Sequence, residues 1–309
     1  MRPSRWRRGG ACSRLQSRAR WLLVVAFAVV VLAVVALVGC WRVVRARFVA
    51  DRPFSPLFGG RYVGPDWAAR NGLETEPVAG ELEDFDVYER PGTDLESGPV
   101  DAFDPDDVHP AVRRFYERTS DYDLVYETRW HRGFRLGAWL ASFATARLEQ
   151  LNLPGRSDGR TRRLESRLAR VPTSADPRDA RVWTRIDPDS GEAVFVATYA
   201  THERAVVTYA NVAVPLPASN LSTVLRPEQC SLESGAKGVT FTTRGPGDGG
   251  LFLVTPFGAI RLPMEQQFRV WPVAGGGQDR LHASHEMWLF GRQFLTIEYV
   301  IEARERNSR

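Results

Sequence analysis

The sequence has almost no lysine and no pair of cysteines in its main part. Of the 41 basic residues only Lys237 is a lysine, a bias that a GC-rich genome produces without any functional cause. Cys12 and Cys40 lie before and at the end of an apolar run, so Cys230 is the only cysteine in the rest of the chain. A disulfide framework needs paired cysteines and is therefore excluded.

The short motifs that identify common enzyme classes are also missing. The chain contains no Gly-x-Ser-x-Gly, no phosphate-binding loop, no dinucleotide-binding glycine motif and no Cys-x-x-Cys. Such motifs carry nucleophiles, phosphate sites and redox thiols. An enzyme on this chain would need a site built from dispersed residues. We therefore predict no catalytic residue, no metal site and no cofactor, and we favour a non-enzymatic role without deciding the question.

Acidic residues are absent from the first 47 positions, and this shapes the charge of the whole chain. Residues 1–47 hold ten arginines, whereas residues 48–309 hold 31 basic and 37 acidic residues, a net charge of −6. The overall charge of +4 thus comes from the N-terminal segment. Because a nucleic-acid-binding domain needs a basic surface, we predict that nucleic acid is not a partner.

One long apolar run is present near the N-terminus. Residues 21–39 read WLLVVAFAVVVLAVVALVG without a charged side chain. With its flanking residues a helix here spans about 30 Å, the thickness of the hydrocarbon core of a bilayer. Seven arginines lie in residues 1–20 and four in residues 41–52. By the positive-inside rule we predict a transmembrane helix over residues 21–40 of the cell membrane, with a cytoplasmic N-terminus and the C-terminal domain outside.

The end of this run permits a second interpretation. Leu37 and Gly39 precede Cys40 at the offsets of a lipobox, where bacterial lipoproteins are cleaved and acylated. However, the run is longer than the roughly 7 to 15 apolar residues of a cleavable signal peptide, and Trp41 and Arg42 follow the cysteine directly. We favour an uncleaved signal anchor, with lipidation at Cys40 as the alternative.

The middle of the chain predicts a spacer followed by helices. Residues 41–108 are rich in proline, glycine and acids, and their aspartates lack the regular pattern of a calcium site. A short helix is expected from His109-Pro110, with Asp106 or Asp107 as its N-cap. Apolar residues at helical spacing predict a second, amphipathic helix over residues 133–151, lying on a β domain or, alternatively, on the membrane surface.

From residue 180 the pattern changes to short strands separated by glycine- or proline-containing turns. In the last of them Leu295, Ile297 and Tyr299 alternate with polar residues, as in a strand with one buried face. Seven or eight such strands predict an α+β fold with an antiparallel β-sandwich or barrel and one or two helices packed on it. The predicted segments are a cytoplasmic basic tail (1–20), a transmembrane helix (21–40), a spacer (41–108), a helical segment (109–155), a basic linker (156–179) and the β domain (180–304).

Two groups of residues superficially resemble catalytic or metal sites. Ser234 and Lys237 match the Ser-x-x-Lys pair of penicillin-binding proteins, but the surrounding glycines predict a hairpin turn and the companion motifs are missing. His282 and His285 would point to opposite faces of a strand, which leaves at most a pair between His282 and Glu286. We interpret both groups as structural.

The aromatic residues of the β domain carry the functional hypothesis. They form either an ordinary core or the lining of a barrel or cleft that binds an apolar ligand such as a lipid near the membrane surface. The alternatives are an interaction or assembly factor with an envelope protein as partner, and a hydrolase without a recognisable motif. The residues expected to contact the ligand are Trp183, Phe195, Tyr199, Tyr209, Trp271 and Trp288.

Overall fold

A computed structural model describes most of the chain beyond its N-terminal segment. The described residues are 48–49, 66–89, 103–134, 162–189, 191, 193–204, 207–231, 235, 237–273 and 280–304. The chain divides into two compact units, residues 1–48 and 49–309, and the features below belong to the second. The predicted transmembrane helix, Cys40 and almost all of the second predicted helix lie outside the described residues. Within the described ranges, no helix is both long and apolar enough to cross a membrane.

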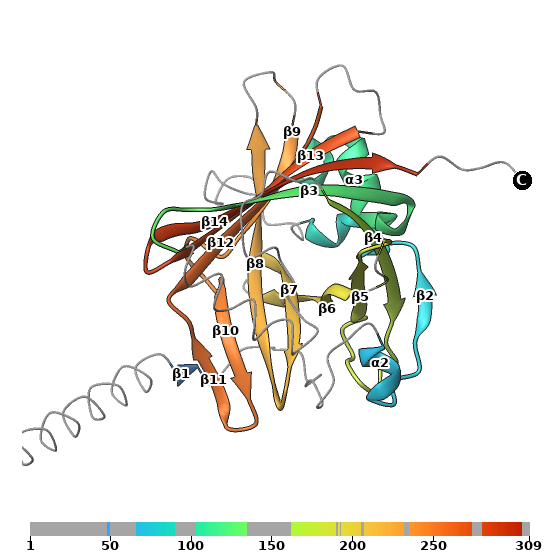
Figure 1. The fold of residues 1–309 in the computed structure, drawn as a ribbon, viewed down its shortest axis with the longest axis vertical. Coiled ribbons are helices and arrows are strands. Elements are labelled where there is room, and N and C mark those ends of the chain that lie inside the picture. Colours follow the sequence, from blue (N-terminus) through green and yellow to red (C-terminus); the bar gives the residue numbers. More distant parts are fainter. Residues whose placement is uncertain are drawn as a thin grey trace, which may run out of the picture. The chain divides into compact units, whose positions relative to one another are not determined.

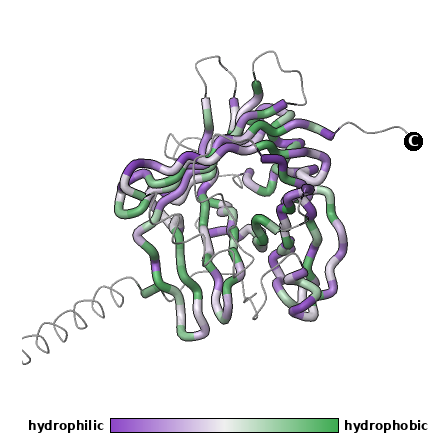
Figure 2. Tube along the Cα trace, in the orientation of Figure 1, coloured by the Kyte–Doolittle hydropathy of each residue, from purple (hydrophilic) through white to green (hydrophobic). Residues whose placement is uncertain are grey.

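Ten antiparallel strands of the second unit close into a barrel (Figure 1). They follow one another nearly in chain order, and the last pairs with the first. Side chains alternate between the interior and the outside along each strand, and Figure 2 shows apolar and polar residues interspersed along the strands. The ring consists of β3 (Tyr122–Trp130), β4 (Arg162–Arg170), β5 (Arg181–Ile186), β6 (Ala193–Arg204), β7 (Val207–Leu216), β8 (Ser219–Ser231), β9 (Lys237–Thr242), β12 (Met264–Pro272), β13 (Arg280–Leu289) and β14 (Arg292–Ala303).

Strand β8 has two successive partners on one edge. Its first half pairs with β10 (Gly250–Thr255), and its second half, from Arg226, pairs with β9. Strand β10 continues into a hairpin with β11 (Gly258–Arg261), which is not part of the ring. On its other edge β8 pairs with β7 only as far as Leu225. Pro227 is therefore tolerated in this long strand, because its missing N–H removes no bond to β7.

One end of the barrel interior is filled by a segment that we call the cap, residues 79–89 and 103–121. It contains η1 (Phe85–Tyr88), η2 (Pro105–Asp107), α3 (Pro110–Glu117) and η3 (Thr119–Asp121). Helix α3 buries Val112, Phe115 and Tyr116 in the main core, beside inward residues of β12 to β14. Its N-cap is His109, whose ring Nδ1 accepts from the Ala111 N–H at 3.2 Å. The prediction that Asp106 or Asp107 is the N-cap was wrong, because both residues lie inside η2.

Gly80 lies where the cap backbone passes closest to helix α3. A Cβ at this position would come within 2.2 Å of the Glu117 carbonyl group. We expect Gly80→Ala to lower the free energy of unfolding by roughly 1–3 kcal/mol, since overpacking must displace backbone. Urea unfolding measures this effect, and Ala79→Ser at the exposed neighbouring position should stay within about 0.5 kcal/mol of wild type. Equal stabilities of the two variants would contradict the close approach.

The outer face of the barrel is partly covered by the segment predicted as a spacer. Helix α2 (Trp67–Arg70) places Trp67, which is 1% exposed, in a cluster with Val182 and Val196 of β5 and β6. Strand β2 (Glu76–Val78) pairs with residues 168–170 of β4, beyond the residues of β4 that pair with β3. The remaining described strand, β1, is Phe48–Val49. Trp67 and β2, within the predicted spacer, thus pack on the barrel.

The predicted α+β architecture needs correction. The described residues are mostly β-strand, with α2 and α3 as their two α-helices, and the strands close into a barrel, so the sandwich alternative is wrong. Residues 122–130, which have a strand-like pattern within the predicted helical segment, form β3, whereas residues 162–170 of the predicted basic linker form β4. Strand β4 was missed because its inward face reads Leu164, Ser166, Leu168 between arginines, which hides the apolar alternation.

Candidate functional site

The barrel encloses a cavity of about 350 Å³ beside the cap. Its lining comes from every strand of the ring, from β10 and from the cap, and most of the lining side chains are aliphatic or aromatic. Ala210, Val212 and Val214 of β7 are small inward residues that leave this space unfilled. A cavity of this size and polarity is typical of a small-molecule site.

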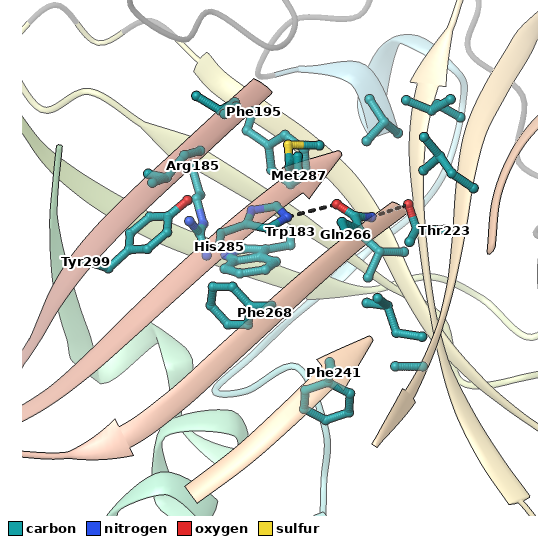
Figure 3. Close-up of a pocket in the computed structure, with 18 of the residues that line it drawn as sticks. Trp183, Arg185, Phe195, Thr223, Phe241, Gln266, Phe268, His285, Met287 and Tyr299 are labelled. Carbon is teal, nitrogen blue, oxygen red and sulfur yellow. Dashed lines mark hydrogen bonds between the residues drawn. The ribbon is translucent and has the colours of Figure 1, made fainter. Parts of the chain in front are cut away.

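Three of the six residues predicted to contact a ligand line this cavity. They are Trp183 of β5 and Phe195 and Tyr199 of β6 (Figure 3 labels the first two). The Trp183 and Phe195 rings meet edge to face at 6.4 Å. The Tyr199 hydroxyl is hydrogen-bonded to the Tyr88 hydroxyl. This bond joins the cavity wall to the cap.

The other three predicted residues do not line the cavity. Tyr209 stacks on His202 at 5.1 Å between ring centroids, and Trp271 stacks on His282 at 6.2 Å. Trp288 has the guanidinium of Arg244 over its ring at 4.5 Å. The sequence does not show which face of each strand points into the barrel. It therefore could not separate these aromatic residues from those that line the cavity.

Arg185 is the one arginine of the cavity lining, and it is 7% exposed. Its Cζ lies 3.9 Å from the centroid of the Trp183 ring and 5.5 Å from that of Tyr299 (Figure 3). Its positive charge opposes the effect of burial, which raises the pKa of the Tyr299 hydroxyl. The Arg185 Nε has no hydrogen-bond partner among the described residues.

Glu81 is the one carboxyl group of the cavity lining, and the cap supplies it. Burial raises its pKa to about 8, against smaller opposing effects of Arg185, Thr119 and Arg181. At neutral pH the side chain is therefore protonated and uncharged. Its Oε1 has no hydrogen-bond partner among the described residues.

A chain of three polar side chains crosses part of the cavity wall. Gln266 of β12 donates from its amide nitrogen to the Thr223 hydroxyl at 2.8 Å, and its oxygen is 2.8 Å from Nε2 of His285 (Figure 3). This arrangement requires His285 to carry its proton on Nε2. Burial, assisted by Arg185, lowers the pKa of His285 to about 4. The imidazole is therefore neutral at neutral pH.

The motifs set aside in the sequence have structural surroundings. Lys237 begins β9 and is paired with Asp107 of the cap, while Ser234 lies outside the described residues. His282 and His285 point to opposite faces of β13, as predicted, and Glu286 is paired with Arg269 at 2.8 Å. Across the described parts of the chain, no three metal-ligating side chains gather.

The polar residues of the cavity were missed by sequence reasoning. Arg185 belongs to RVWTRI, in which the alternation suggests that Val182, Thr184 and Ile186 point inward and Arg185 outward. Both faces of β5 are buried, so the pattern does not reveal the inward face. Glu81 belongs to the predicted spacer, and Gln266 resembles any polar strand residue. The closed ring and the cap together bring these residues to one cavity.

Comparison with known proteins gives one informative relative. Over 274 residues, 86% of this chain, the sequence is 30% identical to a Bacillus subtilis (strain 168) protein named uncharacterized membrane protein YndJ. The chain spans 46% of the length of that relative. No protein-family profile matches the sequence, and no solved structure matches it.

Proposed function

We propose that this chain is a membrane-associated protein whose barrel binds an apolar ligand such as a lipid. The cavity of about 350 Å³ inside the closed ring carries the proposal. Filling it with an apolar molecule would remove apolar surface from water and restore dispersion contacts that an empty space lacks. Trp183, Phe195 and Tyr199 would contact the ligand.

The membrane part of the proposal has separate support. The relative is named a membrane protein, and residues 21–39 form an uncharged apolar run. We propose that the chain contacts the lipid membrane through residues 21–40, with the barrel at the outer face. A barrel near lipid would have apolar and amphiphilic molecules close at hand as ligands.

A bromine-labelled probe tests the ligand-binding proposal. In the full chain kept soluble by an amphipol, ω-bromoundecanol should quench tryptophan fluorescence saturably, because Trp183 and Trp130 line the cavity. The double variant Ala210→Phe, Val212→Phe fills the space beside β7 and should weaken binding at least about tenfold, equivalent to 1.4 kcal/mol.

The control makes the same two exchanges outside the cavity. Ala79→Phe with Val87→Phe changes exposed residues of the cap, and this variant should bind the probe like wild type. Quenching that does not saturate in wild type, or that survives unchanged in the filled variant, would exclude the cavity as a ligand site.

A further inference from the structure

We propose that the cavity selects amphiphiles with an anionic head, a carboxylate or phosphate group, which the Arg185 guanidinium binds while the apolar walls hold the chain. This inference rests on the proposed function and names the class of ligand. It follows from the position, burial and missing counter-charge of one side chain.

Arg185 has no ionic partner among the described residues. An arginine stays protonated in proteins, so its charge persists even when it is 7% exposed. Among the ion pairs of the described residues none includes Arg185. Its contacts there are with the Trp183 and Tyr299 rings, and its charge acts at longer range on Glu81 and His285. A buried charge without a counterion is unfavourable unless another partner arrives.

Arg181, on the same strand and the same face, shows how this chain satisfies a buried arginine. It is 3% exposed, donates to the Gly80 carbonyl oxygen at 2.8 Å and pairs with Asp179 at 2.9 Å. Arg181 thus has partners within the protein, whereas Arg185 faces the cavity. We infer that a bound ligand supplies the negative charge that the protein does not place beside Arg185.

The surroundings of Arg185 do not neutralise its charge. Glu81 is the one carboxyl group that lines the cavity, and it is protonated at neutral pH because burial raises its pKa to about 8. His285 is uncharged there as well. The charge of the cavity interior is therefore positive, which favours an anion and disfavours a cation.

The geometry also provides donors for an anionic head. The unpartnered Nε–H of Arg185 belongs to a planar fork that can bind carboxylate or phosphate oxygens in pairs. The Tyr299 hydroxyl lines the same cavity and, because burial raises its pKa, keeps a hydrogen that it can donate. The neighbouring walls, including Phe195, Phe268 and Met287, offer no competing charge to the attached chain (Figure 3).

Paired probes that differ only in the head group test this inference. Quenching by ω-bromoundecanoate and ω-bromoundecanol is compared at neutral pH in the full chain, in Arg185→Met and in Arg185→Lys. A hydrogen bond to a charged group contributes about 1.5–3 kcal/mol, so wild type should bind the acid roughly ten- to a hundredfold more tightly than the alcohol. Arg185→Met should lose this preference and still bind the alcohol, and Arg185→Lys should keep part of it.

Two controls separate the sources of binding. Arg244→Met removes a charge from the outer surface, where Arg244 lies over Trp288, and should keep the preference for the acid. Acetate and inorganic phosphate should not compete with ω-bromoundecanoate at equal concentration, since they lack the apolar chain. Competition would mean that the cavity binds free anions, and it would overturn the inference that the ligand is an amphiphile. Equal affinity of wild type for acid and alcohol would overturn the inference while the proposed function stands. Binding of neither probe would reject both.

Discussion

In the wild-type protein the titration of Glu81 should lower the free energy of unfolding as pH rises, and Glu81→Gln is expected to abolish this pH dependence. The folded protein keeps the Glu81 proton up to about pH 8, because burial raises the pKa from its ordinary value of 4.5. The unfolded chain releases this proton near 4.5, so the folded state is the more protonated one between the two values. Its stability advantage is complete below pH 4.5 and is lost as pH rises to 8.

His285 acts in the opposite direction and defines the pH window of the test. Its pKa falls from 6.5 to about 4 on burial, so its contribution to stability is complete above pH 6.5 and is lost as pH falls to 4. Between pH 4.5 and 6.5 the two slopes cancel. Between pH 6.5 and 8 Glu81 acts without opposition from His285, and the loss should be about 2 kcal/mol at 1.36 kcal/mol per pH unit.

Urea unfolding at a series of pH values measures the effect as a difference between wild type and Glu81→Gln. This difference should change by about 2 kcal/mol between pH 6.5 and 8, with the variant gaining relative to wild type. Glu83→Gln is the control, because the Glu83 side chain is 80% exposed and its variant should follow wild type. A pH-independent difference for Glu81→Gln would mean that Glu81 is ionised in the folded protein.

Arg185→Met and Arg181→Met should change stability in opposite directions. Without ligand, Arg185 carries a buried charge that lacks a counterion. A methionine of similar size should therefore raise the free energy of unfolding by about 1–4 kcal/mol, the range seen when buried ionic groups are replaced by apolar ones. The aromatic contact that is lost contributes at most about 2 kcal/mol.

Arg181→Met removes a side chain whose partners are present. It loses the bonds to Gly80 and Asp179, and we expect a loss of about 2–4 kcal/mol from two charge-assisted bonds. Both variants are compared by thermal and urea unfolding of the same preparation without added ligand. A destabilised Arg185→Met would indicate that protein groups already satisfy the guanidinium, and would weaken the case for an anionic ligand.

Sequence reasoning reached many of the strands but not their closure. Strands β5 to β7 and β9 to β14 were predicted because alternation or runs of β-branched and aromatic residues mark them. Strand β8 was missed because Pro227 and its polar outward residues interrupt the pattern, and β4 because its arginines do. Without β4 and β8 the predicted strands do not form a closed ring, so a sandwich and a barrel fit the sequence equally well.

The site was less accessible to sequence reasoning than the fold. Trp183, Phe195 and Tyr199 were found because aromatics are conspicuous, yet Tyr209, Trp271 and Trp288 were equally conspicuous. Their difference lies in which face of each strand is inside, and β5 is buried on both faces. Arg185 and Glu81 lie 104 positions apart in the sequence and line one cavity only because the cap enters the barrel.

The pairing of β3 with β14 has a consequence for biosynthesis. This ladder runs from Tyr122 opposite Ala303 to Trp130 opposite Leu295, so it joins the first ring strand to the last. A ribosome must deliver residues 292–303 before the seam can close, and until then β3 and β13 each keep an unpaired edge. Contacts so distant in sequence form slowly, and open edges recruit other strands. The newly made protein should therefore depend on chaperones most strongly just before residues 292–303 emerge.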